Sequence, residues 1–143
     1  MAADLLSSLR RLLGRWSRSL LAGCLGLCLL LAGCSSADGL SGSYVDDTVA
    51  VADVLITTVG LEADDPSRAE AEQEARGLIN EYMARYRPRN AVNGLSSFTT
   101  MQTALNSLAG HYANYPNRPL PEALRERVSK ELLKAEKNVV RGA

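Results

Sequence analysis

Four stretches of this chain repeat apolar residues at every third or fourth position, which is the spacing of one face of an α-helix. They lie at about residues 44–59, 65–87, 96–115 and 121–140. Their apolar stripes are, in order, Val45, Val49, Ala52, Leu55, Ile56 and Val59; Ala71, Ala75, Leu78, Ile79, Tyr82, Met83 and Tyr86; Phe98, Met101, Leu105, Leu108 and Tyr112; and Leu124, Val128, Leu132, Ala135 and Val139. No segment sustains the period-two alternation of a strand. The sequence therefore predicts an all-α fold, an antiparallel bundle of four helices over residues 44–143.

Local signals set the expected helix ends. Ser43 and Asp46 form an S-x-x-D start for the first helix, and Asp65 followed by Pro66 suits the start of the second. "NAVNGLSS", residues 90–97, predicts a loop, and "YPNRPLP", residues 115–121, a stiff connection. The basic cluster "RYRPR", residues 85–89, could contact anionic headgroups or an acidic protein surface, or could be a solvated helix end.

The first 33 residues have the features of an export signal. Four arginines precede an uncharged apolar run at residues 20–32, which at about 13 residues is shorter than the ~20 that span a bilayer as a helix. The run ends in Leu-Ala-Gly-Cys, which resembles the bacterial lipobox, where a lipid is joined to the cysteine thiol. We expect residues 1–33 to be a lipoprotein signal peptide, Cys34 to be lipidated, and residues 34–43 to form a flexible tether. Conventional cleavage after Ala37 is the alternative.

Composition limits the possible chemistry. After residue 33 the chain has 12 basic and 15 acidic residues, a net charge of −3, so nucleic-acid binding is not expected. Cys24 and Cys28 leave with the signal, and lipidation of Cys34 would leave no free thiol. His111 is the only histidine, and no G-x-S-x-G motif marks a nucleophile. We expect no metal site, no cofactor and no catalytic residue; a small hydrolase that uses His111 is the enzymatic alternative.

The stretch "SFTTMQTALNSLAGHYANYPNRPLPEALRERV", residues 97–128, resembles the signature of the small lumenal lipoproteins that assist photosystem II assembly and repair. "GSYVDDTVAVADVL", "EARGLINEYMARYRP" and the final "RGA" resemble the same family, and the lipobox is typical of its cyanobacterial members. The resemblance implies a right-handed, up-down-up-down four-helix bundle without a cofactor or enzymatic activity. It also implies a lipid-anchored monomer on the lumenal side of the thylakoid membrane.

The implied partner is immature photosystem II, chiefly the lumenal loop of the smaller inner antenna chlorophyll protein. Binding would be transient and would precede installation of the manganese cluster and the extrinsic subunits. We predict that the third and fourth helices and their connection make the contact, because tyrosine and arginine are favoured at binding hot spots. The predicted contact residues are Phe98, Tyr112, Tyr115, Asn117, Arg118 and Arg125. Phe98 could equally belong to the core, and a periplasmic lipoprotein that binds a cell-envelope partner is the alternative function.

Overall fold

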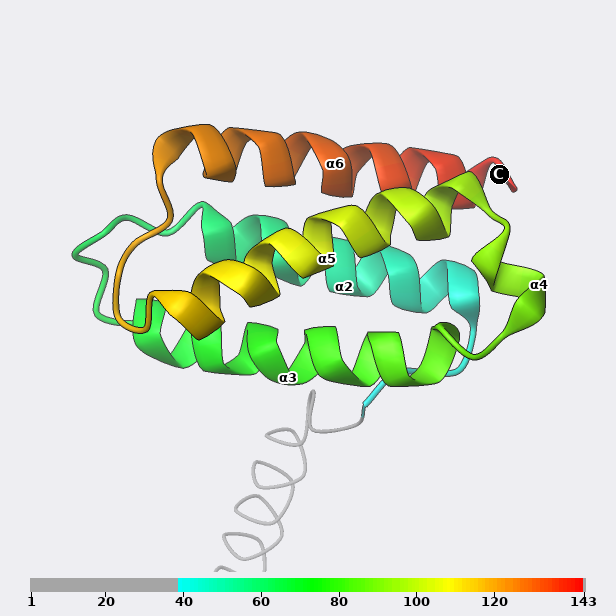
Figure 1. Cartoon of the computed structure of the whole chain (residues 1–143), viewed down its shortest axis with the longest axis horizontal. Helices are drawn as coiled ribbons and strands as arrows, with labels where there is room; N and C mark the ends of the chain where they lie inside the picture. Colours follow the sequence, from blue (N-terminus) through cyan, green and yellow to red (C-terminus); the bar gives the residue numbers. More distant parts are fainter. Residues whose placement is uncertain (1–38, 143) are drawn as a thin grey trace, which may run out of the picture. The chain divides into compact units, whose positions relative to one another are not determined.

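The computed structural model describes residues 39–142, and they form one helical unit (Figure 1). Its elements are α2 (Tyr44–Val59), α3 (Arg68–Tyr86), the short α4 (Asn90–Asn93), α5 (Ser96–Asn114) and α6 (Glu122–Val140). No strand occurs among these residues. The predicted signal peptide, Cys34 and residues 34–38 of the predicted tether lie outside the described part of the chain.

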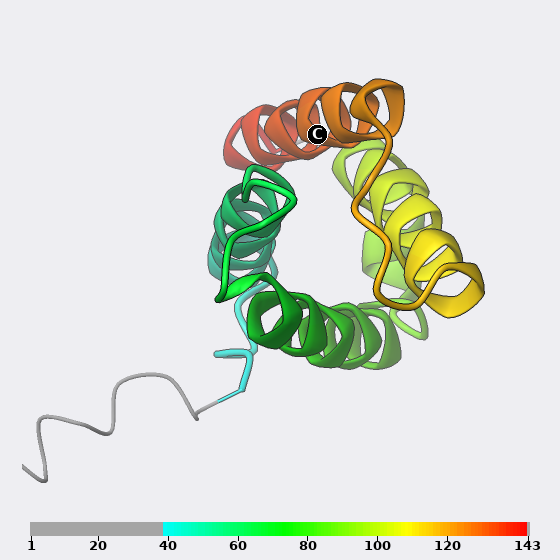
Figure 2. The ribbon, with the colours of Figure 1, turned by 90° about the vertical axis from the view of Figure 1, so that its left-hand side faces the viewer.

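The four long helices stand at the corners of a square when the bundle is viewed along its length (Figure 2). Their order around the square is α2, α3, α5 and α6, and α6 closes the bundle by packing against α2. Three contacts fix the helix directions: Tyr86 Oη donates to Asp47, Tyr44 Oη lies 2.8 Å from Ser97 Oγ, and Asn138 Nδ2 donates to Ser96 Oγ at 3.3 Å. The starts of α2 and α5 therefore meet the ends of α3 and α6. The predicted all-α, up-down-up-down bundle is confirmed.

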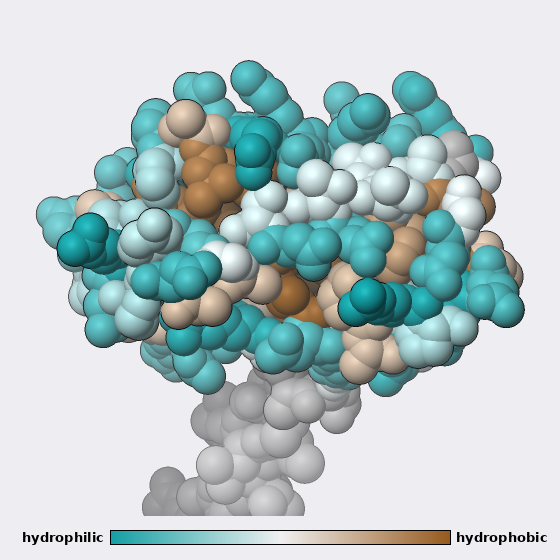
Figure 3. All heavy atoms as spheres, viewed as in Figure 1, coloured by the Kyte–Doolittle hydropathy of each residue, from teal (hydrophilic) through white to brown (hydrophobic). Residues whose placement is uncertain are grey.

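The core fills the interior of the square with side chains from all four long helices. Every residue of the stripe predicted for α5 is buried, and so are four of the five predicted for α6. Three aromatic rings join α3 to α5, with the Tyr82 centroid 4.9 Å from that of Tyr86 and 6.4 Å from that of Phe98. Burial of a large apolar side chain stabilises the fold by about 1.5–3 kcal/mol. The face of the bundle drawn in Figure 3 is accordingly mainly hydrophilic, with apolar areas that are small and separate.

The first turns of α2 differ from the prediction. Val45 was expected to face the core but is 41% exposed, whereas Asp47 and Thr48 are buried. Thr48 Oγ1 lies 2.7 Å from Tyr82 Oη and donates to the Tyr44 carbonyl at 2.6 Å. A buried polar group with hydrogen-bond partners carries little desolvation cost. In its first turns α2 therefore faces the interior with Asp47 and Thr48, which have polar partners there. Apolar residues face the core from Val51 onward.

Two predicted boundaries also change. Asp65 does not cap the second helix; its Oδ1 accepts hydrogen bonds from the Ser67 backbone nitrogen at 2.8 Å and from Ser67 Oγ at 2.6 Å, and α3 begins at Arg68. Within the predicted loop, α4 forms one helical turn that buries Val92. The predicted Ser43 cap is confirmed, because its side chain accepts from the Asp46 backbone nitrogen. None of the helices described here has the length and apolar character needed to cross a membrane.

Candidate functional site

The two ends of the bundle are built from different elements. The strap end contains the starts of α2 and α5, the ends of α3 and α6, and α4. The far end contains residues 60–67, which join α2 to α3, and residues 115–121, which join α5 to α6. Residues 39–43, which lead into α2, are called the strap.

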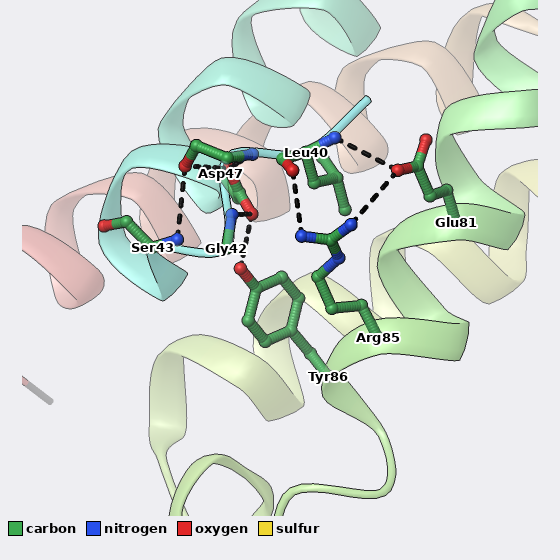
Figure 4. Close-up of polar contacts among 8 residues, drawn as sticks. Leu40, Gly42, Ser43, Asp47, Glu81, Arg85 and Tyr86 are labelled. Carbon is green, nitrogen blue, oxygen red and sulfur yellow. Dashed lines mark hydrogen bonds and ion pairs between the residues drawn. The ribbon is translucent and has the colours of Figure 1, made fainter. Parts of the chain in front are cut away.

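Asp47 holds the strap on the bundle (Figure 4). One carboxylate oxygen, Oδ1, accepts hydrogen bonds from the Ser41 backbone nitrogen at 2.7 Å and from Ser41 Oγ at 2.6 Å. The other, Oδ2, accepts from the Gly42 backbone nitrogen at 3.0 Å and from the Tyr86 hydroxyl. Asp47 is 3% exposed, so its charge is satisfied by these donors rather than by bulk water.

A second set of contacts holds the strap against α3. The Leu40 backbone nitrogen donates to Glu81 Oε1 at 3.0 Å, and Arg85 Nη1 donates to the Leu40 carbonyl at 2.8 Å (Figure 4). Gly42 has a φ of 94°, which side-chain-bearing residues rarely adopt, and a Cβ at Gly39 would collide with the Glu81 carboxylate. Residues 39–43 are therefore part of the folded unit rather than of the flexible tether that their composition predicts. A flexible tether is left as a prediction for residues 34–38 alone.

The hydrogen bonds at Asp47 also affect the ionisation of Asp47 and Tyr86. Burial alone would raise the pKa of Asp47, but hydrogen bonds from the Ser41 and Tyr86 side chains and from the strap backbone more than offset it, so the pKa lies below its usual value. Burial raises the pKa of Tyr86, and donation to Asp47 raises it further. Tyr86 therefore remains a protonated donor and Asp47 a charged acceptor at neutral pH.

The far end presents three of the six predicted contact residues. Tyr115 is 52% exposed, and Asn117 and Arg118 are exposed beside it on the connection. Asn117 adopts a φ of 67°. The connection is held by a 3.2 Å hydrogen bond between His111 Nε2 and the Arg118 carbonyl, by the Arg118 backbone nitrogen, which donates to the Tyr115 carbonyl at 3.2 Å, and by burial of Leu120. A tyrosine and an arginine are thus displayed on a preformed loop.

The remaining three predicted contact residues have other positions. Phe98 and Tyr112 are 2% and 3% exposed, so their rings belong to the core and offer almost no surface to a partner. Phe98 also lies at the strap end, away from the connection. Arg125 is half-buried on the first turns of α6, with Nη2 3.6 Å from Glu122 Oε2. Among the predicted residues, the surface at the far end therefore consists of Tyr115, Asn117, Arg118 and part of Arg125.

An open groove of about 380 Å³ lies between α3 and α5. Arg76 and Tyr112 line it; the Arg76 Cζ is 5.3 Å from the centroid of the Tyr112 ring, and Arg76 Nη2 donates to the Tyr112 carbonyl at 3.3 Å. Burial is the main cause that raises the pKa of Tyr112 to about 12. Across residues 39–142, no three histidine, cysteine, aspartate or glutamate side chains gather as metal ligands would.

The family model described as Photosystem II Pbs27 matches residues 13–139 of this sequence. The chain belongs to this photosystem II family. The family predicted from the stretch at residues 97–128 is thereby confirmed. The match covers the four helices, including the strap end and the far end.

Individual relatives agree with the family match. The chain is 47% identical over 123 residues to the Photosystem II lipoprotein Psb27 of Synechocystis sp., covering 86% of this chain and 92% of the relative. It is 46% identical over 113 residues to the Photosystem II assembly factor lipoprotein Psb27 of Thermosynechococcus vestitus, covering 78% of this chain and 84% of the relative. The solution structure of Psb27 from cyanobacterial photosystem II has a TM-score of 0.71 at 48% identity, covering 77% of this chain and 96% of that one. The crystal structure of PSB27 from Arabidopsis thaliana has a TM-score of 0.68 at 36% identity, covering 70% and 98%.

Sequence reasoning missed the strap and its acceptor. The small residues before α2 were interpreted as a linker from their composition, and Asp47 was not part of the apolar stripe predicted for α2. One signal was present: several free backbone donors precede a helix whose first turn carries Asp46 and Asp47. Carboxylates in a first turn often accept from such donors.

Proposed function

We propose that this chain is a non-enzymatic assembly and repair factor for photosystem II. It binds transiently to the lumenal side of the immature complex, before the manganese cluster and the extrinsic subunits are installed. The observation that carries this proposal is the 47% identity over 92% of a relative named Photosystem II lipoprotein Psb27. A second relative is named an assembly factor, and the Arabidopsis thaliana relative, 36% identical, is named a repair protein.

A non-catalytic role is supported by what His111 does in the structure. Its Nε2 bonds to a backbone carbonyl, and its ring lies 5.4 Å from that of Tyr115 and 6.1 Å from that of Tyr112, measured between centroids. These contacts hold the connection at the far end in place. We therefore assign His111 a structural role rather than the role of a general base.

The anchor in this proposal is a lipid on Cys34, after removal of residues 1–33. The lipid holds the bundle at the lumenal surface of the thylakoid membrane and raises its effective concentration near a membrane-embedded client. Individually weak, reversible binding is then sufficient. The mass of the intact protein, purified from membranes, tests the anchor: a diacylglyceryl group on Cys34 is expected, and an N-terminus at Asp38 would contradict it.

The proposed client contact is the lumenal loop of the smaller inner antenna chlorophyll protein, bound through Tyr115, Asn117, Arg118 and Arg125. Arg118 carries an exposed positive charge on a preformed loop. Replacing it with a negative charge would repel the groups of the client that the arginine attracts. We expect Arg118→Glu to weaken capture of the antenna subunit by about tenfold or more. The matched control is Lys130→Glu, the same change in charge at a side chain that is 79% exposed in the middle of α6. Equal capture by wild type and Arg118→Glu would remove the connection from the interface.

A further inference from the structure

We propose that the strap end is a membrane-contact surface, which seats the bundle on anionic lipid headgroups and turns the far end away from the bilayer. This inference rests on the proposed lipid at Cys34 and adds an orientation to it. Three features of the strap end carry the argument: the place where the chain leaves the bundle, the charges there, and exposed apolar side chains.

The docked strap fixes where the anchor leaves the bundle. Leu40 is bonded to Glu81, which lies five residues before the end of α3, or about 8 Å along the helix axis. Cys34 is five positions before Gly39, and five extended residues span at most about 17 Å. The 19 residues of α5 put the far end about 28 Å from the strap end. Leu40 therefore lies about 8 Å from the plane of the strap end and about 20 Å from that of the far end, so a short chain between Leu40 and a lipid on Cys34 favours the strap end.

The strap end also carries cations without an ion-pair partner among the described residues, although the Arg89 Cζ lies 4.8 Å from the centroid of the Tyr86 ring. The exposed side chains are Arg87 and Arg89 at the end of α3, and Lys134, Lys137 and Arg141 at the end of α6. None of the five forms an ion pair with another residue in 39–142. The acidic groups that face them are few: Asp46 is exposed, Glu136 is half-buried, and Asp47 is already bonded to the strap. Lysine and arginine side chains are attracted to an anionic leaflet, and their attractions add over a cluster.

The positions of these cations suit a flat membrane surface better than a small anionic ligand. They belong to α3 and α6, which stand at opposite corners of the square (Figure 2). A small anion can bind one corner but not both, whereas a flat surface contacts both corners at once. The other surface within reach of the anchor is the flank of α2 and α3, where Asp53, Glu70 and Glu74 are exposed and would repel anionic headgroups.

Apolar side chains lie among the cations. Val140 is 69% exposed between Lys137 and Arg141 on α6, and Val45 is 41% exposed at the start of α2. Apolar residues bordered by lysine and arginine suit the boundary between headgroups and acyl chains. The far end offers Tyr115 as its exposed large apolar residue, and the connection that carries it is assigned to the client.

The test uses the mature lipidated chain in vesicles and two matched glycines of the bundle. An added Cβ meets no atom within 4 Å at Gly94, at the strap end, or at Gly110, near the end of α5. With Cys34 lipidated, Gly94→Cys or Gly110→Cys supplies the single free thiol for a fluorescent dye. Lipids with a quencher on the headgroup then report which end lies at the membrane. With anionic vesicles we expect strong quenching at position 94 and weak quenching at 110.

Two changes should remove that difference. Zwitterionic vesicles lack the attracting charge, and a Lys134→Glu/Lys137→Glu/Arg141→Glu variant reverses it; the variant should shift the ratio of the two orientations by more than about tenfold. Helical circular dichroism checks that the variant is folded. Equal quenching at both positions, or quenching at 94 that is unaffected by lipid charge, would overturn the proposal. So would a variant that keeps its orientation in vesicles but fails to bind photosystem II, because the cations would then contact protein.

The mass of the reconstituted protein separates the two proposals. A lipidated chain without a preferred end would overturn the orientation and leave the assembly-factor proposal standing. A chain that is unlipidated when purified from membranes would overturn both the anchor and the orientation.

Discussion

The strap end and the far end are built from the same four helices but use their polar residues differently. At the strap end a buried carboxylate, Asp47, accepts four hydrogen bonds and holds the incoming chain on the bundle. At the far end the polar and aromatic side chains of the connection are exposed, and hydrogen bonds to its backbone, one of them from the His111 ring, hold the loop that carries them. The comparison fits the proposed division of tasks, in which one end holds the incoming chain and the other would present side chains to a partner.

The largest effect expected from this comparison is that of Asp47→Ala. The change leaves the Tyr86 hydroxyl and the strap backbone nitrogens without their acceptor, which should lower the free energy of unfolding by about 3 kcal/mol. Urea unfolding measures the loss, and hydrogen exchange at Ser41 and Gly42 should show the strap released. The far-end counterpart, Asp65→Ala, removes an exposed acceptor of Ser67 and should have a smaller effect. Similar losses for the two variants would contradict the contrast between the ends.

A smaller effect on stability is expected at two positions with positive φ, one at each end of the bundle. Gly42 has a φ of 94° at the strap and Asn117 a φ of 67° at the far end. Gly42→Ala should cost about 1–2 kcal/mol of unfolding free energy, because a Cβ is disfavoured in this conformation. Asn117→Ala should cost about 0.5–1 kcal/mol, because asparagine tolerates the conformation better than alanine does. Thermal unfolding of the two variants compares them directly, and a larger cost at Asn117 would reverse the predicted order.

The smallest effect on the docking of the strap is expected from changes in pH above about 4. The pKa of Asp47 is lower in the folded chain than in the unfolded chain, so its contribution to stability is present above the unfolded value, near 4, and is lost as the pH falls through the folded value. The strap should therefore stay docked between pH 7 and about pH 4 and loosen only below that. The NMR shift of the Gly42 amide against pH measures this. A transition of that amide near pH 6 would show that another group controls the strap.

The sequence was sufficient to predict the four long helices, because beyond the first turns of α2 their apolar side chains largely determine which face is buried. The stripe from Phe98 to Tyr112 was predicted residue by residue and is buried throughout. The same observation explains an error at the candidate site. Phe98 and Tyr112 were assigned to the partner surface as aromatic residues, although their spacing already placed them on the core face of α5.

The strap could not be predicted from periodicity, because it is held by irregular hydrogen bonds to Asp47 nearby and by contacts with residues of α3 far along the chain. Leu40 and Glu81 are 41 positions apart, and Tyr86 and Asp47 are 39 apart. Composition identified residues 39–43 as small and polar, which describes a linker and an ordered turn equally well. For the same reason, the apolar pattern did not predict that Asp47 is buried and Val45 exposed. The hydrogen-bond donors to the buried Asp47 carboxylate come from α3 and the strap rather than from α2 itself.

The central claim is that a lipid-anchored bundle binds unfinished photosystem II through its far end. Native gel electrophoresis of thylakoid membranes tests it most directly, in cells that express the wild type or Arg118→Glu. We predict that the wild type migrates with monomeric photosystem II that does not evolve oxygen, and that Arg118→Glu leaves this band while its lipid-anchored pool in the membrane is unchanged. A wild-type chain that migrates apart from photosystem II, or equally with the oxygen-evolving complex, would contradict the account.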